Sequence, residues 1–218
     1  MRLIDCSVLA RAPVSFAVLA SGSGSNFEAL VHASRASGFP GAIRLLLCDQ
    51  PDAGALERAR RLGIAAECPP CGPLRSRIVD ELPWLERLRE HRIDALLLAG
   101  FMRRVHAPLL EAFAGRMLNI HPSLLPAFPG LRAIERAFEH GVRVMGCTVH
   151  VVSDELDGGA IVGQRAFEVR DGESVGVVSE RMHEAEHALY PECVTRYFAT
   201  ASRLEGRRLM FEGATRNG

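Results

Sequence analysis

The sequence predicts an α/β protein built on a Rossmann-like, open and mostly parallel sheet, with helices on both faces and an antiparallel C-terminal strand pair. Two observations predict the parallel part. Short apolar runs alternate with amphipathic stretches from residue 14 to residue 120, and the first run ends at a Gly/Ser cluster that turns into a helix. A third observation predicts the antiparallel pair, because two strand-like runs follow residue 141 with a turn too short for a crossover helix.

The strands of the parallel part are short runs of Val, Leu, Ile and Ala that end at glycine or polar residues. Helices are expected between them, where apolar side chains recur every three or four positions. Gly63 marks the end of the helix expected at 54–62. The expected strands are 14–20, 42–48, 95–99 and 116–120, and the expected helices are 25–37, 54–62 and 76–91.

The C-terminal part is expected to contain two strands and one long helix. Residues 143–152 and 160–169 have strand-like composition and are joined through Asp157-Gly-Gly. Residues 174–200 carry an apolar stripe at helical spacing, and Pro191 is expected to kink or interrupt this helix.

Length and composition indicate one globular domain. The chain has 218 residues, of which 48% are hydrophobic and 24% charged, as in ordinary α/β proteins. No linker or repeat divides it. The expected divisions are a short extension at 1–13, one domain at 14–205 and a tail at 206–218.

Charge and cysteine usage exclude several classes of protein. Lys+Arg and Asp+Glu both number 26, so no net charge draws the chain toward nucleic acid or an anionic membrane. The absence of a signal segment or an apolar run of membrane-spanning length predicts a cytoplasmic protein. Cys68-Pro-Pro-Cys71 lacks the second pair that would complete a zinc site. We expect small-molecule partners and a monomer or weak homodimer.

The segment Asn119-Ile-His121 is the strongest candidate for catalytic chemistry. It ends an apolar strand, where alternate side chains share one face, and Pro122 opens the loop that follows. An amide and an imidazole on one face, with Asp157 supplying a carboxylate, could polarise an acyl carbonyl and move protons around it. Polar residues at a strand end are also common turn formers, so the pattern alone leaves both interpretations open.

The loop Ser21-Gly-Ser-Gly-Ser-Asn26 lies between the first expected strand and helix. Its glycines and free helix amides suit an anion such as phosphate. Phe27 stands where a dinucleotide fingerprint needs a third glycine, and no Gly-Lys-Ser/Thr follows, which excludes a nucleotide P-loop. A small phosphate site and a plain tight turn remain equally open.

Several motifs together resemble the folate-dependent formyltransferases, most closely the branch that formylates phosphoribosylglycinamide in purine synthesis. The resemblance runs from about residue 14 to about residue 198. It rests on Asn119-Ile-His-Pro-Ser-Leu-Leu-Pro126, Pro129-Gly-Leu131, Gly146-Cys-Thr-Val-His150 and Asp154-Glu-Leu-Asp-Gly-Gly159. It implies the formyltransferase version of the fold, 10-formyltetrahydrofolate as co-substrate, phosphoribosylglycinamide as acceptor and no metal.

The resemblance also implies the catalytic roles. Asn119 and protonated His121 would each donate a hydrogen bond to the oxyanion of a tetrahedral intermediate. Asp157 would hold His121 charged, raising its pKa from the reference value near 6.5, and would help to route the amine proton. Ser123 is expected to brace the loop and not to act as a nucleophile.

Binding residues are carried over in the same way. The phosphate and ribose of the acceptor are assigned to Gly24, Ser25, Asn26 and Glu186. Folate is assigned to Arg77, Met102, Arg103, Arg104 and Val105, together with Asn119. For Arg77 and Glu186, a solvated charge on a helix surface is an alternative interpretation.

Two other activities compete with this interpretation. Formyltetrahydrofolate deformylase would use the same three catalytic residues with water as acceptor. His183-Glu-Ala-Glu-His187 satisfies the His-Glu-x-x-His pattern of zinc hydrolases, although no third ligand is evident. Three positions depart from the family pattern: Ala127 stands where Lys is common, and Arg132 and Ile134 stand where histidines are frequent.

Overall fold

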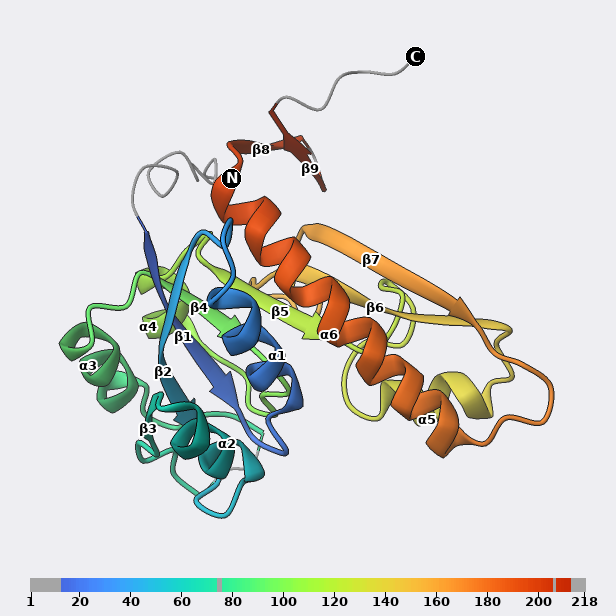
Figure 1. The fold of residues 1–218 in the computed structure, drawn as a ribbon, viewed down its shortest axis with the longest axis horizontal. Helices are drawn as coiled ribbons and strands as arrows, with labels where there is room; N and C mark the ends of the chain where they lie inside the picture. The colour runs from blue at the N-terminus through green and yellow to red at the C-terminus, as the bar shows by residue number, and fades with distance from the viewer. Residues whose placement is uncertain (1–12, 74–75, 206, 213–218) are drawn as a thin grey trace.

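Nine strands of the described residues form a single sheet in this computed structural model, which describes residues 13–73, 76–205 and 207–212 (Figure 1). The strands are β1 (Val14–Ala20), β2 (Gly41–Cys48), β3 (Ala65–Glu67), β4 (Ala95–Leu98), β5 (Met117–His121), β6 (Val144–Val151), β7 (Ile161–Glu168), β8 (Ser202–Glu205) and β9 (Arg208–Phe211). Their order is β3-β2-β1-β4-β5-β6-β7-β9-β8.

The five strands from β3 to β5 are parallel; β6 then pairs antiparallel with β5, and β7 pairs antiparallel with β6. Strand β4 is apolar and buried throughout, and β1 is so except for Ser15, because both faces of these central strands are covered. In β1, Phe16 and Val18 enter the hydrophobic core on one face, and Ala17 and Leu19 enter the core on the other. The predicted fold class is therefore confirmed.

Helices cover both faces of the sheet (Figure 1). They are α1 (Ser25–Ser34), α2 (Gly54–Leu62), α3 (Leu82–Glu90), α4 (Ala107–Ala112), α5 (Ala133–Glu139) and α6 (Val175–Ala199). Residues of α1, α2, α5 and α6 contribute to one core, and residues of α3 and α4 contribute to the other.

The expected helix at 76–91 is wrong in its first turns, because α3 begins only at Leu82. Pro83 lies in the first turn, where its missing N–H would be unpaired in any case, and it could not occupy the interior of a helix starting at 76. Asp80 accepts a hydrogen bond from the Leu82 N–H at 2.9 Å and so starts α3. Helix α1 also ends three residues earlier than expected, at Ser34.

Helix α6 continues through Pro191, so the interruption that the sequence analysis considered at this proline is absent. Packing compensates for the hydrogen bond that proline removes, because buried side chains flank it on both sides, including Leu189, Tyr190 and Cys193. The Tyr190 hydroxyl lies 3.1 Å from the Leu98 carbonyl and 2.9 Å from the Leu118 carbonyl, which ties α6 to β4 and β5.

Several short elements have no counterpart among the expected ones: β3, α4, α5, β8 and β9. Strand β9 lies within the range expected as a tail, and it pairs with β7 and β8. The expected extension at 1–13 lies outside the described residues except for Pro13. None of the described helices combines the length and apolarity needed to cross a membrane.

The strand order locates the ligand site. Strand β1 lies between β2 on one side and β4 on the other, so the chain reverses its direction of travel across the sheet at this point. In open α/β sheets such a reversal leaves a crevice beyond the carboxyl ends of the strands. The loop after β1, the loop after β4 and the end of β5 all meet there.

Candidate active site

Asn119 and His121 project from one face of β5 at its carboxyl end. The side chain of His121 is buried, with 8% of its area exposed. Its Nε2 lies 3.0 Å from the Phe128 carbonyl, and its Nδ1 lies 3.5 Å from Asp157 Oδ2. Acceptors therefore flank both ring nitrogens, an arrangement that the doubly protonated imidazolium satisfies because both of its nitrogens donate.

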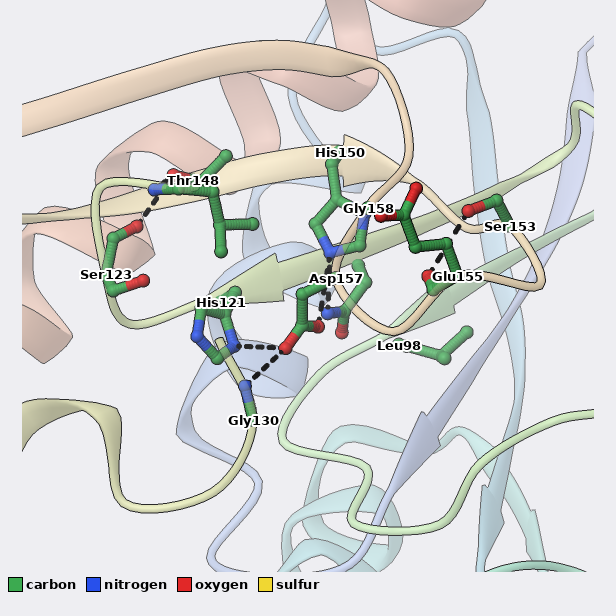
Figure 2. A network of polar contacts seen from close by, with 12 residues as sticks. Leu98, His121, Ser123, Gly130, Thr148, His150, Ser153, Glu155, Asp157 and Gly158 are labelled. Atoms are coloured by element: carbon green, nitrogen blue, oxygen red, sulfur yellow. Dashed lines mark hydrogen bonds and ion pairs between the residues drawn. The ribbon is translucent and has the colours of Figure 1, made fainter. Parts of the chain in front are cut away.

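Asp157 lies between two histidines on the turn after β6 (Figure 2). Its Oδ2 accepts a hydrogen bond from the Gly130 N–H at 2.7 Å, and its Oδ1 is 3.7 Å from His150 Nε2. Burial raises the pKa of Asp157, but the contacts with His150, Gly130 and His121 outweigh burial and hold that pKa below its usual value of 3.8. The carboxylate is thus charged throughout the neutral pH range.

The turn that carries Asp157 requires glycine at its end. Asp157 adopts a left-handed conformation with φ of 51°, and Gly158 and Gly159 follow. A Cβ atom on Gly159 would lie 1.7 Å from the Val151 carbonyl, so only glycine lets the turn approach β6 this closely. This approach brings the Asp157 carboxylate to His121.

His150 is a part of the site to which the sequence assigned no role. It lies opposite Asn119 in the register of β5 and β6, and its residue is 3% exposed. Its Nδ1 is 3.1 Å from the Val151 carbonyl, to which it donates, and its Nε2 lies 3.1 Å from Asn119 Nδ2 and 3.7 Å from Asp157 Oδ1. His150 therefore contacts both the amide and the carboxylate of the predicted catalytic residues.

The loop after β5 is held by buried polar contacts. Ser123 Oγ donates to the Ala127 carbonyl at 2.6 Å, which confirms the expected bracing role. Thr148 Oγ1 donates to the Ser123 carbonyl at 2.6 Å and accepts from the Leu125 N–H at 3.1 Å. Ala127 lies on the exposed part of this loop and does not line the cavity, whereas Arg132 and Ile134 do.

The loop between β1 and α1 faces Glu186 of α6. Gly24 has a φ of 78° and precedes the first turn of α1, whose N–H groups have no acceptors within the helix. Asn26 Nδ2 donates to Glu186 Oε2 at 2.9 Å, and both residues are buried. The sequence alternative of a solvated surface charge is therefore wrong for Glu186.

The segment after β4 is anchored to the neighbouring loops. The Ser21 hydroxyl accepts a hydrogen bond from the Met102 N–H at 2.8 Å. Arg103 Nε donates to Asp49 Oδ2 at 2.6 Å, and both side chains are buried, so this guanidinium holds the loop in place. The Arg77 side chain is exposed and does not line the cavity, although its carbonyl accepts from Arg103 at 3.3 Å.

These segments enclose one cavity of about 540 Å³, within the size range of small-molecule sites. Every residue assigned to catalysis or ligand binding lines it, with the exception of Arg77. The predicted lining residues are Gly24, Ser25, Asn26, Met102, Arg103, Arg104, Val105, Asn119, His121, Asp157 and Glu186.

The two histidines of the His-Glu-x-x-His pattern differ in their surroundings. His183 lines the cavity and its Nδ1 lies 3.2 Å from Glu186 Oε2. His187 lies behind it, with its ring stacked at a centroid distance of 6.4 Å and Nε2 buried. Among the residues that the structure describes, no group of three His, Cys, Asp or Glu side chains is placed to hold a metal ion.

Comparisons with known proteins agree with this geometry. The formyl transferase family matches residues 14–194. A phosphoribosylglycinamide formyltransferase from Bacillus subtilis is 39% identical over 190 residues, which cover 87% of this chain and 97% of that protein. The crystal structure of glycinamide ribonucleotide transformylase 1 from Symbiobacterium toebii is 43% identical, with a TM-score of 0.85, covering 91% of this chain and 94% of that one.

A formyltetrahydrofolate deformylase from Pseudomonas syringae pv. tomato is more distant. It is 20% identical with a TM-score of 0.81, and the match covers 93% of this chain and 67% of that one, a likeness that shows the shared fold alone. The family match spans both β5, with Asn119 and His121, and the turn that carries Asp157. The chain therefore belongs to the formyl transferase family.

Proposed function

We propose that this protein transfers the formyl group of 10-formyltetrahydrofolate to the amine of phosphoribosylglycinamide, a step of purine biosynthesis. The observation that carries the proposal is the cluster of Asn119, His121 and Asp157, which opens on a cavity bounded at one end by the loop at 22–26. The names of the similar proteins support the same donor and acceptor.

In the proposed reaction the amine nitrogen forms a bond to the formyl carbon, and the carbonyl electron pair moves to oxygen. An N–H of the cavity-lining Asn119 and the positive charge of His121 stabilise this oxyanion. Nε2–H of His121 turns from the Phe128 carbonyl toward the oxyanion as the intermediate forms. Catalytic hydrogen bonds are often incomplete before substrate is bound.

Collapse of the intermediate breaks the bond between the formyl carbon and N10 of the folate. The attacking nitrogen loses one proton, and N10 gains one as it leaves, so the step is balanced without a metal or an oxidant. Asp157 carries negative charge beside His121 and is placed to accept and return a proton through water.

The two ends of the cavity are assigned to the two substrates. The first-turn amides of α1, together with Gly24 and Asn26, would bind the phosphate, and Glu186 would accept from a ribose hydroxyl. The segment 101–105 would bind the folate, with Met102 contacting the ring and Arg103 maintaining the loop. Arg77 is not part of this proposal.

The proposal is tested by following loss of 10-formyltetrahydrofolate in the presence of purified protein, with and without phosphoribosylglycinamide, and with and without EDTA. We expect consumption only when the glycinamide is present, one formylated product for each formyl group lost, and no effect of EDTA. Consumption without acceptor would identify a deformylase, and loss of activity in EDTA would indicate a metal at His183. Either result would contradict the proposal.

A further inference from the structure

Three cysteines lie close to the carboxyl end of β2, outside the cavity. Cys48 ends β2, and Cys68 and Cys71 follow β3, the neighbouring strand. Cys48 is buried, Cys71 is half-buried and Cys68 is exposed. None of the three lines the cavity, so the proposed reaction leaves this group of thiols without a role.

The pairing of β2 with β3 brings Cys48 and Cys68 side by side. The two strands are parallel and their last paired residues are Leu47 and Glu67, so the next position on each strand is a cysteine. Neighbouring strands lie about 4.8 Å apart, within the range of about 4.4–6.8 Å between Cα atoms that a disulfide spans. The two thiols are also in hydrogen-bond contact. A bond between them therefore requires little movement of the strands.

Cys71 is held away from Cys68 by the two prolines between them. Each proline restricts its own φ and favours an extended backbone at the residue before it. Three extended steps of about 3.1 Å would separate the two cysteines by about 9 Å, beyond the reach of a disulfide. The Cys71 thiol instead donates to the Asp49 carbonyl at 3.6 Å. Cys48 is therefore the thiol within reach of Cys68.

Asp49 and Gln50 connect these thiols to the segment 101–105, which the proposed function assigns to the folate. The Cys48 thiol donates to the Gln50 carbonyl at 3.2 Å. Asp49, the next residue after Cys48, accepts through Oδ2 from Arg103 Nε at 2.6 Å and from Gln50 Nε2 at 2.9 Å. The buried pair of Arg103 and Asp49 holds the segment 101–105 in place. A change at Cys48 thus reaches this segment through one residue.

We propose that Cys48 and Cys68 form a reversible disulfide, and that this bond loosens the Asp49–Arg103 contact and so weakens binding of the folate co-substrate. The oxidant would be a small disulfide, such as glutathione disulfide. The effect on folate rests on the proposed function, whereas formation of the disulfide does not.

The oxidation consists of two thiol–disulfide exchanges. The Cys68 thiolate attacks one sulfur of glutathione disulfide, forms a mixed disulfide and releases one glutathione thiolate; Cys48 then attacks Cys68 Sγ and releases the second. The protein loses two electrons and two protons, and glutathione disulfide gains both to become two thiols. Burial raises the pKa of Cys68, and the hydrogen bond with Cys48 opposes this effect. That hydrogen bond and its exposure make Cys68 the first of the two to react.

The disulfide would change the contacts that hold Asp49. A sulfur–sulfur bond of about 2.05 Å draws Cys48 toward β3. The S–H group that donates to the Gln50 carbonyl is lost, so the backbone on both sides of Asp49 shifts. The carboxylate of Asp49 then no longer meets Arg103 Nε at hydrogen-bond distance, and the segment 101–105 becomes more mobile.

The first test maps the disulfide in wild type, Cys68→Ser and the matched control Cys71→Ser. Each protein is treated with glutathione disulfide at about pH 8.5, where thiolate is available, and free thiols are then blocked with N-ethylmaleimide. Mass spectrometry without reduction should show a Cys48–Cys68 link in wild type and in Cys71→Ser, none in Cys68→Ser, and full reversal by dithiothreitol. A link from Cys68 to Cys71, glutathione that stays on Cys68, or no reaction at all would overturn the inference.

The second test follows the segment 101–105. On oxidation of wild type, its amide hydrogens should exchange at least about fivefold faster. The KM for 10-formyltetrahydrofolate should rise about tenfold, the lower range for a charged hydrogen bond. The KM for phosphoribosylglycinamide should change less than about twofold, and treated Cys68→Ser should resemble untreated wild type.

The two readouts separate this inference from the proposed function. A Cys48–Cys68 disulfide that leaves both hydrogen exchange and the folate KM unchanged would overturn the link to Arg103. Absence of transfer by the reduced protein would overturn the proposed function, while the disulfide map and hydrogen exchange would still decide the inference.

Discussion

Asp157 receives more polar contacts than any other residue of the catalytic cluster. Its two oxygens face His121, His150 and the Gly130 N–H, and its backbone takes a conformation that few residues other than glycine adopt. A carboxylate held this way both orients the imidazole of His121 and balances its charge. Removing the charge while keeping the shape therefore separates these effects from packing.

We expect Asp157→Asn to lower kcat by at least about 100-fold, because it removes the charge partner of His121 and a route for the proton. The KM for folate should stay within about threefold of the wild-type value, since the segment 101–105 is untouched. Steady-state kinetics measure both quantities. Asp171→Asn is the matched control, since Asp171 is an exposed aspartate that pairs with Arg143 on the surface. Near-normal turnover in Asp157→Asn would remove Asp157 from the mechanism.

At the residue scale, the sequence identified the side chains that form the site but not the residues with which they make hydrogen bonds. Alternation along a strand sufficed to place Asn119 and His121 together. The contact of Asn119 with His150 required the register of β5 and β6, and the pairing of Arg103 with Asp49 joins segments 54 residues apart. Partners of this kind depend on tertiary structure, which no local pattern contains.

At the scale of elements, α6 links the helical layer to the strands that carry the site. The Tyr190 hydroxyl reaches the carbonyl of Leu98, which lines the cavity at the end of β4, and that of Leu118, one residue before Asn119 in β5. Tyr197, two turns later, donates to the Gly115 carbonyl at 2.8 Å, away from the cavity. The two tyrosine hydroxyls make similar buried hydrogen bonds, one beside the cavity and one away from it.

We expect Tyr190→Phe and Tyr197→Phe each to lower the free energy of unfolding by about 0.5–1.5 kcal/mol, because each removes a buried hydrogen bond of the tyrosine hydroxyl. Urea denaturation at constant m-value measures this loss. Turnover should fall in Tyr190→Phe and stay within about twofold of wild type in Tyr197→Phe, since only Tyr190 supports the ends of β4 and β5. Equal turnover in the two variants would show that Tyr190 does not position the site.

The elements that the sequence predicted are those with a long hydrophobic signal of their own. Strands β1, β2 and β4 are apolar on both faces, and α2 ends at Gly63 as expected. Helix α4 has only six residues, and its first turn is capped by the distant Glu81 carboxylate, which accepts from the N–H groups of His106 and Leu109. Such an element is stable only within the folded chain, so its own residues do not reveal it.

At the scale of the whole molecule, the sheet separates two hydrophobic cores, and the buried cysteines Cys147 and Cys193 belong to one of them. Burial raises the pKa of Cys147 and of Cys193 to about 12 and that of Cys48 to about 11. Cys68 is exposed on the surface. Thiol reactivity should therefore distinguish the intact molecule from an opened one.

We expect iodoacetamide at pH 8 to modify the exposed Cys68 well before Cys147 and Cys193, which should stay unmodified until urea unfolds the chain. A pKa near 12 leaves about a thousandfold less thiolate than an ordinary thiol, and burial also denies access. Peptide mapping by mass spectrometry after timed alkylation gives the rate at each cysteine. Modification of Cys147 at the rate of Cys68 in the native protein would contradict the buried core around β6.

The in-register pairing of Asn119 with His150 makes chain length, and not only residue identity, a condition for activity. A deletion of one residue within β6 would turn every following side chain to the opposite face and carry His150 away from the amide that it contacts. Segments between the strands have more freedom, because extra residues there can loop outward. Over evolutionary time this site should therefore accept insertions in the loops around it, while the spacing from Thr148 to Asp157 stays fixed.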